Sequence, residues 1–188
     1  MPSNPTNKIP TIEFEVNEIN TKSDSRVRIN VAQSFHHKVG ETLKPYKNVP
    51  KLFRPALEQI GDYVRINMIP RTFNSEGPGW APLSQRTITD KRRLGYGNRK
   101  ILQRSGDLYK ELTSKAHPKH FEIIRVGKMA RIEIGGSSAK FLENQQGRTD
   151  KNLPARPMIP GTGGTQFAAR DRIEIRRIIQ RAIRERTK

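Results

Sequence analysis

The chain has 188 residues and a formal net charge of +18, with 36 Lys and Arg against 18 Asp and Glu. This length fits one domain of ordinary size, and the charge predicts an anionic partner, either a phosphate backbone or an acidic protein surface. Because the sequence contains no cysteine, disulfides and thiolate chemistry are excluded.

The N-terminal quarter predicts an extended arm followed by an ambiguous segment. Residues 1–20 are rich in Pro, Asn and Ser at their start, and Ile12, Phe14 and Val16 alternate with polar residues as in a half-buried strand. From Val27 onward, strand-like alternation competes with helical spacing, and we favour a helix through Leu43. We therefore expect an arm over 1–20 and one domain over 21–188.

The best helix of the first half spans residues 51–68, where apolar residues recur in steps of three and four. Pro70 is expected to end this helix, because proline removes a backbone donor and clashes with the preceding turn. Residues 70–100 carry several Gly and Pro with little periodicity, so they predict a long central loop. A loop of that length in a compact domain is usually functional or disordered.

The second half predicts a short helix, a hairpin and a basic C-terminal helix. Ser105 can cap a helix over 106–115, and two alternating segments around Gly127 predict a β-hairpin over 121–135. A proline-rich, non-helical segment follows, and residues 167–187 form an amphipathic basic helix. The predicted fold is α+β, with a small antiparallel or mixed sheet packed by two longer helices.

The sequence contains few residues arranged as a catalytic site would require. The four histidines form the pairs His36–His37 and His117/His120, which lack a carboxylate or cysteine at metal-ligand spacing. The glycine-rich run 161–165 lacks the lysine that ends a nucleotide-binding loop. We therefore expect no enzymatic activity, no cofactor and no metal.

No signal-peptide core or apolar run of about 18 residues is seen, so we expect a soluble protein made in a cytoplasm, without a membrane partner.

Three stretches of the sequence resemble the phage virion morphogenesis family, which includes tail completion proteins of contractile-tailed phages. They are Gly79-Trp80-Ala81-Pro82-Leu83-Ser84, then Lys100-Ile101-Leu102-Gln103-Arg104-Ser105-Gly106-Asp107-Leu108, and finally Asn144-Gln145-Gln146-Gly147 followed by Leu153-Pro154-Ala155-Arg156-Pro157-Met158. Their order and spacing match the family over about residues 55–185. Lys140-Phe141 and Asn144 depart from the family's Tyr-Ala and His, so that contact surface is not carried over.

The resemblance implies a virion protein of the tail and neck, assembled in the host cytoplasm. It would form a ring, a hexamer by the resemblance, at the head-proximal end of the tail, and join the tail to the neck. The implied partners are further copies of itself, a neck or connector protein, and a tail-tube or tail-terminator protein. The alternative is a basic nucleic-acid-binding protein without a sequence-specific motif.

Two groups of residues are candidates for these contacts. Contacts between subunits or with a partner are assigned to Trp80, Pro82, Leu83, Arg92, Arg93, Pro154, Arg156 and Pro157. Contacts with packaged DNA or an acidic partner are assigned to Arg170, Arg177, Arg181 and Arg184. The sequence leaves open whether Trp80 holds the loop as a latch or belongs to the chain's own core.

Overall fold

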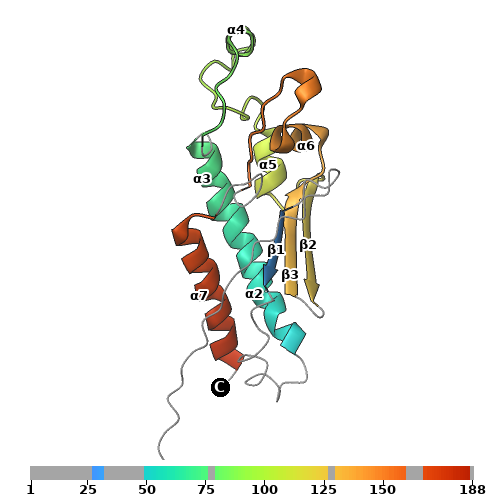
Figure 1. The fold of residues 1–188 in the computed structure, drawn as a ribbon, viewed down its shortest axis with the longest axis vertical. Coiled ribbons are helices and arrows are strands. Elements are labelled where there is room, and N and C mark those ends of the chain that lie inside the picture. The colour runs from blue at the N-terminus through green and yellow to red at the C-terminus, as the bar shows by residue number, and fades with distance from the viewer. Residues whose placement is uncertain (1–26, 32–48, 76–78, 127–129, 160–166, 187–188) are drawn as a thin grey trace, which may run out of the picture.

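The computed structural model describes residues 27–31, 49–75, 79–126, 130–159 and 167–186, and Figure 1 shows their arrangement. The chain is α+β, as the sequence predicts. In chain order, the elements are β1 (Val27–Val31), α2 (Val49–Tyr63), the π-helical segment η2 (Val64–Met68), α3 (Ile69–Asn74), α4 (Gln85–Arg93), α5 (Asp107–Thr113), β2 (His120–Val126), β3 (Ala130–Gly136), α6 (Ala139–Gln146), the 3-10 turn η3 (Thr149–Lys151) and α7 (Ala169–Arg186). The predicted arm over 1–20 lies outside the described residues.

The sheet is antiparallel, with strand order β1-β3-β2. The hairpin predicted over 121–135 is confirmed, and Ile124 pairs with Ile132 across it. On the other edge of β3, Ile29 pairs with Ile132, so the helix that we favoured from Val27 is wrong over 27–31. Alternating β-branched residues suit a strand beside a central partner, and this tertiary pairing decides between the two periodicities. The remainder of the segment, 32–43, lies outside the described residues.

Pro70 does not end the first long helix, contrary to the prediction. Helix α2 runs through η2 into α3, and the backbone N–H of Ile69 donates to the carbonyl of Val64, five residues earlier. This wider turn comes directly before Pro70, which occupies the first turn of α3, where its missing N–H is not needed. The π-helical segment therefore lets the helix continue to Asn74.

The core lies between the sheet and two helices. Helix α2 packs directly on the sheet at Gly61, where a Cβ atom would lie 2.8 Å from Ile132 Cδ1. Helix α7 packs on α2, on the side away from the strands (Figure 1), and buries Ile175, Ile178 and Ile179. The C-terminal helix is confirmed, beginning at Ala169, and the described core has the order sheet, α2, α7.

A buried carboxylate fastens the start of α7 to the long helix. Asp171 is 3% exposed, accepts a 2.7 Å hydrogen bond from Tyr63 Oη and pairs with Arg71. Burial, followed by the hydrogen bond to Asp171, raises the pKa of Tyr63 above its usual value. Tyr63 precedes η2 in the chain and Arg71 follows it. The π-helical segment therefore helps to set the positions from which both side chains reach Asp171.

Replacing Asp171 with alanine should destabilise the fold by about 2–3 kcal/mol, because it removes the buried acceptor of a charge-assisted pair. Urea unfolding measures this loss. Glu174→Gln is the matched control on the same helix, since the Glu174–Arg177 ion pair is largely exposed and should cost well under 1 kcal/mol. Equal stability of Asp171→Ala and wild type would contradict the assigned tether.

Candidate functional site

Residues 79–101, here called the α4 lobe, project beyond α3 at the end of the molecule away from α7 (Figure 1). The predicted long loop over 70–100 is wrong in part, because α3 occupies its start and α4 its middle. Ser84 begins α4 as an N-cap whose Oγ accepts the N–H of Thr87 at 3.3 Å. The Gly-Pro spacing before α4 obscured the short helix, whereas Ser84 was the local signal for it.

Trp80 anchors the first residues of the lobe. Its side chain is 8% exposed, and its indole Nε1 donates to the carbonyl of Pro157 at 3.0 Å. The ring meets Phe73 at the end of the long helix edge to face, with centroids 5.8 Å apart. Trp80 therefore belongs to the chain's own core and at the same time ties the lobe to the proline-rich segment.

Arg156 makes the second tie between the same two segments. It is 5% exposed, and its Nε and Nη2 each donate to the carbonyl of Ala81 at 3.2 Å. Nη2 also reaches the carbonyl of Pro82 at 3.4 Å. Burial lowers the pKa of Arg156, but a guanidinium in a protein remains charged. A planar fork suits this role, because one side chain then binds two successive carbonyls.

The segment that carries Arg156 is itself fixed by the turn after α6. The backbone N–H of Arg156 donates to Asn144 O at 2.6 Å, and that of Met158 donates to Gln145 Oε1 at 2.8 Å. Gly147 has a φ of +74°, and a Cβ there would lie 2.7 Å from the backbone nitrogen of Ala155. The Gln-Gln-Gly turn thus needs glycine both for its conformation and for the close approach of the chain.

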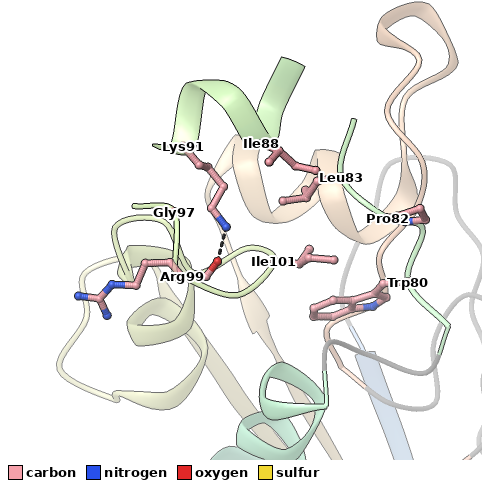
Figure 2. Close-up of a pocket in the computed structure, with 8 residues that line it drawn as sticks. All are labelled: Trp80, Pro82, Leu83, Ile88, Lys91, Gly97, Arg99 and Ile101. Atoms are coloured by element: carbon pink, nitrogen blue, oxygen red, sulfur yellow. Dashed lines mark hydrogen bonds between the residues drawn. The ribbon is translucent and has the colours of Figure 1, made fainter. Parts of the chain in front are cut away.

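Basic side chains close the lobe by donating to backbone carbonyls. Lys91, 8% exposed, donates from Nζ to Arg99 O (Figure 2). The same atom donates to Lys100 O at 3.3 Å. Lys100 Nζ in turn donates to Asn74 O, and Gln103 Nε2 donates to Phe73 O at 3.0 Å. The bonds from Lys100 and Gln103 satisfy carbonyls at the C-terminus of α3, which have no partner within the helix.

A pocket of about 360 Å³ opens within the lobe. Figure 2 shows Trp80, Leu83, Ile88 and Ile101 directed toward a common space, with the guanidinium of Arg99 directed away from it. The complete lining is Trp80, Pro82, Leu83, Ile88, Lys91, Gly97, Arg99 and Ile101. Most of the lining side chains are apolar, and the ammonium group of Lys91 is already bonded to backbone carbonyls, so the pocket can accommodate an apolar group.

The structure brings most of the first group of predicted contact residues together. Trp80 and Arg156 are buried within the chain, where they hold the lobe. The other members are distributed as follows: Leu83 and Pro157 are half-buried, Pro82 and Pro154 are exposed, and Arg92 and Arg93 are exposed on α4. Their contact with another subunit or partner stays a prediction.

The second predicted group lies apart from the lobe. Its four members are all exposed on α7: Arg170, Arg177, Arg181 and Arg184.

The sequence did not predict Ile88 and Ile101 as pocket residues. It also did not predict the apolar residues Leu94 and Tyr96 as exposed, although they are 46% and 37% exposed. The position of Ile101 within the second family-like stretch was the available signal; for Leu94 and Tyr96 there was none in the periodicity.

The described residues contain no group of His, Cys, Asp or Glu arranged to hold a metal ion. No helix in the described ranges has the length and apolar character needed to cross a membrane. The described residues thus form a small α+β fold with a projecting lobe.

The family model of the phage virion morphogenesis family matches residues 36–184, which include the whole of the α4 lobe and all of α7 except its last two residues. The chain belongs to this family and is associated with the phage virion and its assembly. No curated protein and no solved structure matches the chain significantly.

Arg156→Lys should loosen the lobe while leaving the rest of the fold intact, because an ammonium cannot reproduce the fork to Ala81 and Pro82. We expect a loss of about 1.5–3 kcal/mol in the free energy of unfolding and faster chymotrypsin cleavage after Trp80 and Tyr96. Urea unfolding and mass spectrometry of the digest measure the two effects. Arg92→Lys, an exposed change on α4, is the control, and cleavage of Arg156→Lys at the wild-type rate would contradict the assignment.

Trp80→Phe separates the indole hydrogen bond from the ring. The variant keeps the edge-to-face packing on Phe73 but removes the donor to Pro157 O, so we expect a cost of about 1 kcal/mol. Trp80→Ala also removes the buried ring and should cost about 3–5 kcal/mol. Thermal or urea unfolding of both variants gives the difference, and equal losses would show that the hydrogen bond, rather than the ring, carries the contact.

Proposed function

We propose that the protein is a structural component of the virion that forms a ring at the head-proximal end of the phage tail and joins the tail to the neck. The observation that carries this proposal is the α4 lobe, a projecting surface that is hydrogen-bonded to the body at both of its ends. Family membership supports the setting in the virion. The role is one of binding, without catalysis.

The lobe offers two different surfaces, which is what a ring requires. In a cyclic assembly the contacts are heterologous, so each subunit presents one surface to the preceding copy and another to the next. The apolar pocket over Trp80 and Ile101 is one such surface, and the exposed Leu94 and Tyr96 form the other. A side chain from one copy would enter the pocket of its neighbour, and closure at six copies is the ring order that the family resemblance implies.

Anchoring of the lobe favours a contact of this kind. A surface that is already held in place loses little conformational entropy on association, and an aromatic or aliphatic side chain in a pocket is a common centre of binding energy. The exposed Arg92 and Arg93 lie on α4 beside this surface and would contribute to its polar rim. The partners beyond the ring are a neck or connector protein and a tail-tube or tail-terminator protein.

A basic nucleic-acid-binding protein is the second candidate, and the net charge of +18 is the observation that favours it. The two functions differ in particle location and assembly. In a phage lacking the gene, the first predicts separate heads and tails, with the protein located at the neck of wild-type particles by immunogold electron microscopy. Joined, infectious particles without the protein would refute it, and a monomer that binds duplex DNA and is absent from virions would favour the second.

Leu94→Glu should abolish ring formation, because it places a charge among the side chains that enter the neighbour's pocket. The variant should also fail to restore infectivity to a phage that lacks the gene. The monomer should unfold within about 0.5 kcal/mol of wild type, since Leu94 is exposed. Light scattering and plaque counts measure the two effects. Ile66→Glu is the matched control, because Ile66 is exposed on the long helix at 59%; a ring of normal size in Leu94→Glu would exclude this surface.

A further inference from the structure

The outer face of α7 combines a dense array of arginines with one apolar side chain. Asp171, Ile175, Ile178 and Ile179 turn inward, which fixes the opposite side of the helix as the exposed one. The exposed arginines on that helix are Arg170, Arg172, Arg176, Arg177, Arg181 and Arg184. This set, together with Ile173, is here called the arginine face.

Helix stability does not explain the arginine face. Arg172 and Arg176, like Arg177 and Arg181, are like charges four residues apart, which destabilises a helix. Arg170 and Arg172 also lie in the first turn, where the helix dipole disfavours positive charge. On this face Glu174 offsets part of the charge by accepting a 3.2 Å hydrogen bond from Arg177. The like-charge pairs and the arginines of the first turn cost stability in the isolated chain, and an anionic partner would offset that cost.

Ile173 indicates which kind of anion the face recognises. It is 49% exposed and, at 100° per residue, points almost directly away from the buried stripe, among the arginines. A nucleic-acid backbone offers an isoleucine at the centre of the contact only the C–H groups of its sugars, because binding to the backbone relies mainly on charge and hydrogen bonds. An acidic protein surface with an apolar side chain at its centre can satisfy both features, because interfaces surround apolar anchors with a polar rim.

We propose that the arginine face of α7 docks an acidic protein surface that presents an apolar side chain to Ile173. This inference deepens the proposed function and rests on it for the setting, since it assigns to α7 the contact with a second virion protein. The face is separate from the α4 lobe, so one subunit can contact its neighbours in the ring and this partner at once. Charge sets the attraction and the orientation, and Ile173 adds discrimination against nucleic acid.

Binding assays with defined probes test the proposal. The probes are two synthetic helical peptides with the same number of glutamates, one carrying leucines and the other serines between them, and a duplex DNA oligonucleotide. We expect the wild-type protein to bind the leucine peptide about 3- to 10-fold more tightly than the serine peptide in fluorescence anisotropy at physiological salt, as partial burial of one isoleucine implies. Ile173→Ser should remove this difference, and Ile66→Ser, the matched exposed isoleucine, should retain it.

A double change, Arg177→Gln with Arg184→Gln, should weaken binding of both peptides and flatten its salt dependence. Equal affinity of the wild type for the two peptides would overturn the inference. Duplex DNA that binds more tightly than either peptide, and whose affinity Ile173→Ser leaves unchanged, would also overturn it and assign the face to nucleic acid. Leu94→Glu must leave peptide binding unchanged, so loss of the ring and loss of this docking surface are distinguished.

Discussion

The α4 lobe depends on the hydrogen bonds that the guanidinium group of Arg156 donates to it. The guanidinium is buried, and it donates to the carbonyls of Ala81 and Pro82, on a segment more than seventy residues away along the chain. An unpaired charge at that depth would be costly, so the fold is consistent only when the proline-rich segment and the start of the α4 lobe lie side by side. Trp80 uses the same juncture, donating to Pro157 O beside Arg156. The position of the pocket follows from these two contacts.

The three stretches that resemble the family form one structural unit. The first contains Trp80 and the carbonyls that Arg156 binds, and the third contributes Arg156 and the turn at Gly147 that holds it. The second contributes Ile101 to the pocket, while its Lys100 and Gln103 cap the end of α3. Motifs separated in sequence by tens of residues thus meet in a single set of hydrogen bonds and apolar contacts. This explains physically why their joint order and spacing say more than any one of them.

Local patterns predicted the elements whose signal lies within a single element. The β2–β3 hairpin and α7 follow from alternation and from an apolar stripe, and both are present. The sequence misled where a distant or unusual contact decides. Strand β1 depends on pairing with β3, and the passage of the helix through Pro70 depends on a π-helical turn at η2. At the candidate site, Trp80 and Arg156 were recognisable from their motifs. The pocket and the exposed Leu94 depend on α4, a short helix that the surrounding glycines and prolines made difficult to predict.

The division between buried and exposed side chains separates what holds the protein together from what it can offer a partner. Several charged groups make their contacts within the chain. Asp171 holds α7 against the long helix, Lys91 binds a backbone carbonyl inside the lobe, and Arg156 binds the start of the lobe. These groups leave the apolar pocket and the arginine face of α7 as distinct, outward-facing surfaces. A subunit with one apolar and one charged surface at different places can make two kinds of contact without competition between them. The large positive charge therefore does not require a nucleic-acid partner, because part of it serves backbone carbonyls within the fold and the part on α7 surrounds an isoleucine.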